Sequence, residues 1–181
     1  MRRLGIMTAL VTLLMAVSAT VALAAVAPGT YTPTAGSFNG ANAPGSSHLT
    51  SGSPSCTVNA DRSIDCTAYV LGGVGHTNGN VALTASYTAI IDCYNHGVNP
   101  NNAVESHQTS FSPTSQTAVT SSKNGQLSVP TRSVSFSGAP IGCPNANWTP
   151  TIRPGSQTLN SFSYTLTFAG FTSAYITISQ P

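Results

Sequence analysis

Three titratable residues in the middle of the chain could serve as metal ligands or as an acid–base group. They are His96, Glu105 and His107, with Asp92 nearby. Glu105 and His107 are two positions apart, a spacing that places both side chains on one face of a β-strand. The segment 97–102 matches no ligand motif, so we interpret the group as polar surface residues. We expect no metal site and no cofactor.

Hydrolytic chemistry has little support in the sequence. A serine hydrolase holds a nucleophile, a base and an orienting acid together, often on a Gly-x-Ser-x-Gly turn that this chain lacks. A paired-carboxylate glycosidase would need two of the four acidic residues, and the nearest pair, Asp61 and Asp65, flanks a predicted hairpin turn. We therefore expect no catalytic residues and no enzymatic activity.

The single tryptophan, Trp148, is the candidate for a ligand platform. Carbohydrate-binding modules stack sugar rings on exposed aromatic side chains, and Trp148 with Tyr94 or Tyr175 could form such a surface. The alternative is a packing role, because a lone tryptophan beside a disulfide cysteine more often lies in a core or at its rim. Both interpretations stay open at this point.

Four cysteines allow three disulfide connectivities. If residues 56–58 pair antiparallel with residues 64–66, Cys56 lies directly opposite Cys66, which favours this bond and leaves Cys93 with Cys143. No pair has the C-x-x-C spacing of a zinc or redox site. We therefore predict two disulfides, Cys56–Cys66 and Cys93–Cys143.

Alternating apolar residues predict the strands that position these groups. Every second residue from Val81 to Cys93 is apolar, which is the period of a half-buried strand, and residues 161–168 repeat the pattern. Asn124 and Gly125 are typical of a tight hairpin turn, because both residues tolerate positive φ. Many short strands separated by turn residues predict an all-β fold: an antiparallel two-sheet sandwich of the immunoglobulin-like kind, stapled by disulfides. A jelly roll or a barrel is the alternative.

The N-terminus predicts export. Arg2 and Arg3 precede an uncharged apolar run over residues 4–24 that ends at Ala22, Leu23 and Ala24. This is typical of a secretory signal peptide over residues 1–24. An uncleaved anchor is the alternative, since the run approaches the ~20 residues that a membrane span needs. We expect cleavage, an extracellular product and no stable membrane anchor.

Beyond the signal peptide we predict two regions. Residues 25–55 are rich in Pro, Gly, Ser and Thr with few apolar residues, which indicates a flexible lead with at most an edge strand near residues 30–34. Residues 56–181 are expected to form the β-sandwich domain.

Charge excludes two classes of partner. Without residues 1–24 the chain has four basic residues (Arg62, Lys123, Arg132, Arg153) and four acidic ones (Asp61, Asp65, Asp92, Glu105). Nucleic-acid binding draws on a Lys or Arg for each phosphate contact, and attraction to an anionic membrane needs the same supply. We expect no nucleic acid partner; the expected partner is an extracellular protein or a polysaccharide.

The order of several motifs resembles a group of small secreted bacterial proteins, many of them actinobacterial. The likeness rests on Cys56 and Cys66, a long strand ending at Cys93, a Cys-Pro-Asn-x-x-Trp element at residues 143–148 and the closing residues 171–178. The resemblance implies secretion, disulfides and a β-rich fold, and it implies no activity or site.

These observations together favour a secreted, non-enzymatic protein with a structural or interaction role outside the cell or at its surface. The first alternative is a carbohydrate- or cell-wall-binding module. The second is a fibre subunit in which the N-terminal region is a strand donated to a neighbouring molecule.

Overall fold

The computed structural model describes residues 25–95 and 103–181 and shows an all-β protein. The expected signal peptide and His96 lie outside the described residues. Thirteen strands and one short 3-10 turn, η1 (Gly40–Asn42), are present in the described part. The strands are β1 (Gly29–Tyr31), β2 (His48–Gly52), β3 (Cys56–Val58), β4 (Ile64–Cys66), β5 (Tyr69–Gly72), β6 (Gly79–Asn95), β7 (Glu105–Phe111), β8 (Thr114–Val119), β9 (Leu127–Val129), β10 (Arg132–Val134), β11 (Trp148–Ile152), β12 (Thr158–Phe168) and β13 (Ile176–Gln180).

The central strand is β6, which is 17 residues long. One edge of β6 pairs with β12 and then β11, while the other edge pairs with β8 and then β7. The strand β13 adds to the outer edge of β12. The alternation from Val81 to Cys93 puts every second side chain of β6 in the interior, as its period predicts.

Two short antiparallel sheets form the second layer, in the orders β1-β3-β4-β10 and β2-β5-β9. Side chains of all three sheets share one hydrophobic core, and the Tyr164 hydroxyl of β12 donates a 3.1 Å hydrogen bond to the Tyr69 hydroxyl of β5. The sheets do not close into a barrel. Among the described residues, no helix has the length and apolar character needed to cross a membrane.

Residues 25–55 belong to this fold, which corrects the expectation of a flexible lead. The strand β1 pairs with β3, and β2 pairs with β5. The Val26 N–H donates to the Leu159 carbonyl over 2.8 Å, and the side chain of Val26 is buried. The physical reason is that a segment with few apolar residues can still be held by backbone hydrogen bonds to the edges of sheets.

The outer edge of β13 is closed by the same N-terminal region. The Thr34 N–H donates to the Thr177 carbonyl over 2.8 Å, and the Phe38 N–H donates to the Tyr175 carbonyl over 2.7 Å. The Ser37 hydroxyl both donates to the Thr177 carbonyl and accepts from the Thr177 N–H. Residues 34–38 thus satisfy backbone groups that an edge strand would otherwise expose.

Both predicted disulfides are present. Cys56 and Cys66 are directly opposed in the β3–β4 pair, as the antiparallel register predicts, and they are bonded. Cys93 of β6 is bonded to Cys143, 50 residues further along the chain. The described part of the chain has no free cysteine.

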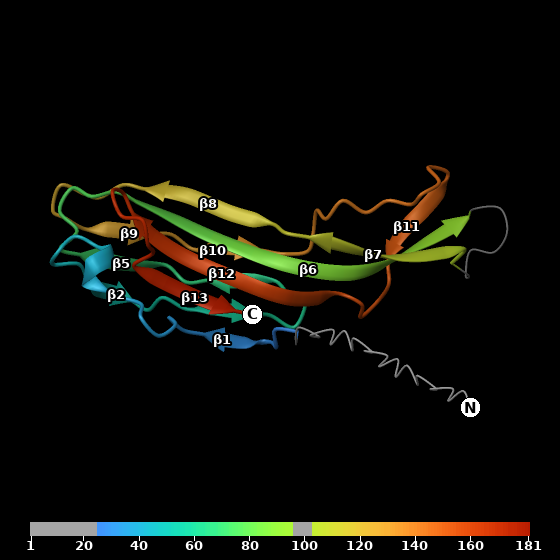
Figure 1. Cartoon of the computed structure of the whole chain (residues 1–181), viewed down its shortest axis with the longest axis horizontal. Helices are drawn as coiled ribbons and strands as arrows, with labels where there is room; N and C mark the ends of the chain where they lie inside the picture. The colour runs from blue at the N-terminus through green and yellow to red at the C-terminus, as the bar shows by residue number, and fades with distance from the viewer. Residues whose placement is uncertain (1–24, 96–102) are drawn as a thin grey trace, which may run out of the picture.

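The C-terminal half of β6 extends with β7 and β11 past the ends of the short sheets, at the right of Figure 1. We call residues 89–95 of β6 together with β7 and β11 the arm. Its inner face continues the buried face of β6, and Cys143 attaches the segment 135–147 to that face. The ring of Phe136 makes edge contacts with Tyr87 and Phe111, at centroid distances of 5.8 and 6.0 Å.

Candidate functional site

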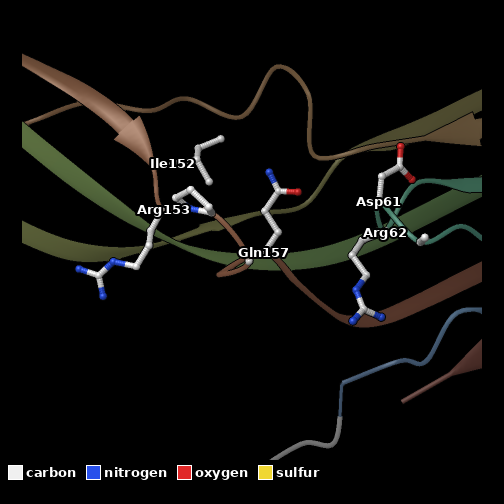
Figure 2. Close-up of a pocket in the computed structure, with 8 residues that line it drawn as sticks. Asp61, Arg62, Ile152, Arg153 and Gln157 are labelled. Carbon is white, nitrogen blue, oxygen red and sulfur yellow. The ribbon is translucent and has the colours of Figure 1, made fainter.

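A groove lies where the arm meets the two-layered body. It consists of two adjoining cavities of about 400 and 450 Å³ that share Asp61, Ile152 and Gln157 as lining residues. Its walls are the β3–β4 turn at residues 60–62, the segment 135–141 and the β11–β12 turn at residues 152–157. We call this feature the junction groove; Figure 2 shows residues that line it.

The β3–β4 turn presents Asp61 to the groove. Asp61 Oδ1 accepts hydrogen bonds from the Ser63 hydroxyl (2.7 Å) and the Ser63 N–H (3.0 Å), which hold the turn. These hydrogen bonds lower the pKa of Asp61 below its usual range, so the side chain is an ionised acceptor at neutral pH.

Tyr87 of β6 holds the β3–β4 turn by a hydrogen bond. Its hydroxyl donates a 2.9 Å hydrogen bond to the carbonyl of Arg62, a residue with a left-handed backbone (φ 69°). Burial, and to a lesser degree the charge of Asp61, raise the pKa of Tyr87 to about 12. Tyr87 is therefore a neutral donor that fixes the turn in place.

The polar groups of the groove separate onto two sides in Figure 2. The carboxylate of Asp61 and the amide of Gln157 point the same way, whereas the guanidinium groups of Arg62 and Arg153 point away from them. Arg62 donates to the Val26 carbonyl over 3.1 Å. The side of the groove that Asp61 and Gln157 share therefore offers a ligand a carboxylate that accepts hydrogen bonds and an amide that can both donate and accept them.

The segment 135–141 adds hydroxyl groups and apolar surface to that side. Ser135 and Ser137 are hydrogen-bonded to each other, while Ile141 is exposed and Ile152 is half-buried. Of the described residues lining the groove, Asp61 is the one carboxylate, and none is a histidine or cysteine. Such a site can hydrogen-bond a hydroxylated ligand and pack against its C–H groups, but it offers no acid–base pair.

An ion pair braces the arm behind the groove. Arg153 donates to both carboxylate oxygens of Asp92, over 2.7 and 3.1 Å, and the Ser106 hydroxyl donates to the same carboxylate over 2.6 Å. Asp92 is only 7% exposed. The hydrogen bonds from Arg153, followed by that from Ser106, lower the pKa of Asp92. The contacts connect β6, β7 and the residue after β11.

Replacing Arg153 with glutamine should raise the pKa of Asp92 toward its ordinary value, as measured by the carboxyl carbon shift in an NMR titration. Because the pKa of Asp92 is lower in the folded state, its stabilisation is complete above the unfolded pKa and is lost as the pH falls through the folded pKa. The Tm difference between wild type and variant should therefore shrink below about pH 4. Lys123→Gln, in an exposed turn, is the control. An equal Tm difference at neutral and acid pH would contradict the assignment.

The group of potential ligands seen in the sequence is divided by the fold. Glu105 and His107 do share one face of β7, opposite Cys93 and Ile91 of β6, as their spacing predicts. Asp92 points to the other face because neighbouring residues of a strand alternate. Within the described ranges, no three His, Cys, Asp or Glu side chains are placed to hold a metal ion.

An aromatic platform around Trp148, one of the two interpretations of this residue, is not assembled from Tyr94 or Tyr175. Trp148 is half-buried on β11, opposite Asn95 in the register, whereas Tyr94 belongs to the other face of β6. Tyr175 is buried 5.5 Å from Phe168 between ring centroids. Phe168 pairs with Gly79 at the start of β6, whereas Trp148 pairs with Asn95 at its end. Neither aromatic residue considered as a partner therefore shares a face with Trp148, whose ring is half-buried.

The junction groove is not apparent from the sequence. Gln157, Ser135 and Ser137 belong to no recognised motif, and Asp61 stands out only as half of a carboxylate pair with Asp65. No motif could have signalled the site, since its walls come from three turns that are distant in the chain.

No protein-family model, curated protein or solved structure matches this chain. The class of protein is therefore defined by its own structure. It is an all-β protein of antiparallel sheets with two disulfides and a ligand-sized groove beside a disulfide-anchored arm.

Proposed function

We propose that this chain is exported and acts outside the cell as a non-enzymatic interaction protein, which holds a polysaccharide segment in the junction groove. The apolar run at residues 4–24 supports export. The two disulfides are compatible with an oxidising compartment, where such bonds persist.

We further assign the fold to the immunoglobulin-like sandwiches. In the seven-strand form of that class the first, second, fourth and fifth strands share one sheet, and the third, sixth and seventh share the other. Here residues 48–58, 64–72 and 127–134 form one layer, while β6, β12 and β13 belong to the other. The fourth segment, β7 with β8, departs from that form, because it pairs with β6 and so lies beside the third strand.

The composition of the junction groove is the observation that carries the proposed function. Asp61 and Gln157 face the same side and can accept from and donate to hydroxyl groups, while Ile141 and Ile152 offer apolar contact. A polysaccharide presents hydroxyl groups and C–H faces together, so it fits this lining better than a charged ligand. With a single carboxylate in the lining, the groove can bind such a chain without cleaving it.

The fibre alternative receives no support from the N-terminal region. The strand β1 pairs with β3 of its own chain, and residues 34–38 bond to β13 of the same chain. To be donated to a neighbouring molecule, the N-terminal region would have to break both sets of hydrogen bonds.

The test uses protein recovered from the outside of the producing cells. Its intact mass should correspond to a chain cleaved after Ala24; a full-length mass would overturn export by signal cleavage. The protein is then pelleted with insoluble chitin, cellulose and peptidoglycan. Gln157→Ala should weaken binding about tenfold, which corresponds to the loss of about one hydrogen bond.

Two further variants distinguish the outcomes. Gln116→Ala, an exposed glutamine on β8, should bind like wild type. Trp148→Ala should also leave binding unchanged; if it abolishes binding and Gln157→Ala does not, the tryptophan is the site and the groove assignment is wrong. Wild-type protein that pellets with none of the three polymers would overturn the proposed function.

A further inference from the structure

The outer edge of β7 is left open by the fold. One edge of β7 pairs with β6 over seven residues, with no shift of register. On its other edge, no backbone hydrogen bond joins β7 to any residue that the structure describes. Glu105, Ser106, Gln108 and Ser110 are exposed. An unpaired strand of this length can template pairing with another strand.

The other edges of the sheets carry features that prevent such pairing. Residues 34–38 are bonded to the outer edge of β13. The strand β11 has Pro150 at its centre, where no N–H is available, and the register of β2 shifts between Leu49 and Ser51. Three edge strands, β1, β9 and β10, have only three residues each, and β8 lies against β10 of the other layer. Proline, irregular register, short length and coverage are the usual means by which edges are blocked.

The edge of β7 has none of these features. Its sequence, Glu-Ser-His-Gln-Thr-Ser-Phe, contains no lysine, arginine or proline, and its pairing with β6 is regular. This contrast with the other edges indicates that the outer edge of β7 is left unpaired so that a strand of another molecule can pair with it. We propose that β7 pairs antiparallel with β7 of a second copy of this chain, about a two-fold axis at Gln108.

This register is self-complementary along the whole strand. It places Gln108 opposite Gln108 of the second copy, Ser106 opposite Ser110 and His107 opposite Thr109, and amide and hydroxyl pairs of this kind hydrogen-bond across strands. Glu105 lies opposite Phe111, so the one acidic residue of each strand does not face its counterpart. The pairing uses the same patch on both molecules, as a two-fold interface requires, and joins the two long sheets into one.

A single introduced cysteine tests the pairing. The described chain has no free thiol, so Gln108→Cys adds one that should meet its counterpart on the two-fold axis. The oxidised protein should run as a dimer on a non-reducing gel. Gln116→Cys, exposed on β8 away from the open edge, should remain a monomer. Equal cross-linking at both positions, or stronger cross-linking at His107→Cys or Thr109→Cys, would overturn the proposed register.

The intact exported protein provides a second measurement. Wild type should show twice the monomer mass by light scattering at high concentration. Gln108→Lys places two like charges opposite each other and should raise the dimer dissociation constant about fivefold. Gln116→Lys is the matched control and should not change it. A wild type that stays monomeric at every concentration, or binds only unrelated extended peptides, would overturn the proposal, whether or not the groove binds polysaccharide.

Discussion

Replacing Cys93 and Cys143 together with serine should lower the free energy of unfolding by about 4 kcal/mol in chemical denaturation. The disulfide closes a 50-residue separation, and constraining a long loop in the unfolded chain gives a large entropic effect. In the folded protein it also holds the segment 135–147 on the inner face of the arm, where Phe136 packs against Tyr87. We therefore expect both stability and the shape of the junction groove to depend on this bond.

The matched control is the double serine variant of Cys56 and Cys66. These residues are ten positions apart, so removal of their bond should cost about 3 kcal/mol. The two variants should also differ in polysaccharide binding, because the wall formed by residues 135–141 depends on Cys143. Hydrogen exchange should show faster opening of the arm only when the Cys93–Cys143 bond is absent. If the two double serine variants lost the same stability and both bound polysaccharide like wild type, the arm would not depend on the Cys93–Cys143 disulfide.

Tyr87→Ala should be comparably damaging, with a loss of about 3–5 kcal/mol. The tyrosine is fully buried in β6, and its ring contacts Phe136 at a centroid distance of 5.8 Å. Removing the ring leaves a cavity beneath the groove and an unpartnered carbonyl at Arg62. Denaturation monitored by circular dichroism measures the loss.

Tyr87→Phe separates the ring from its hydroxyl group. It should cost about 1 kcal/mol, since only the hydrogen bond to the Arg62 carbonyl is lost. Tyr31→Phe is the control: its hydroxyl donates to the Ala27 carbonyl in an exposed position, so the change in stability should be smaller. If Tyr87→Phe were as damaging as Tyr87→Ala, the packing argument would be wrong.

Much of the fold could be predicted because it follows from local periodicity. The alternation of Val81 through Cys93 and of residues 161–168 marked β6 and β12, the strands at the centre of the long sheet. The predicted turn at Asn124 and Gly125 is present, with Gly125 at a positive φ of 71°. The strands around that turn were less predictable: β8 joins the long sheet, while β9 joins the short one.

The N-terminal region and the groove could not be predicted by the same reasoning. Val26 and Ser37 are held by contacts to β12 and β13, more than 130 residues away, and no local pattern records such partners. The surroundings of Trp148 were set by long-range contacts in the same way. The register of β11 against β6 puts Trp148 opposite Asn95 and leaves Tyr94 on the other face, and the position of Tyr175 depends on its packing against Phe168.

The sequence by itself predicted that this protein is built of antiparallel strands and favoured a bond between Cys56 and Cys66, because side-chain alternation and hairpin register are local properties. It also determined that the chain has few Lys and Arg residues, because charge is a matter of composition. Only the tertiary structure decided that Asp61 and Gln157 face the same groove, that Arg153 pairs with Asp92 and that β7 keeps an open edge. These depend on which turns and edges meet, and that outcome is set by packing between segments far apart in the chain.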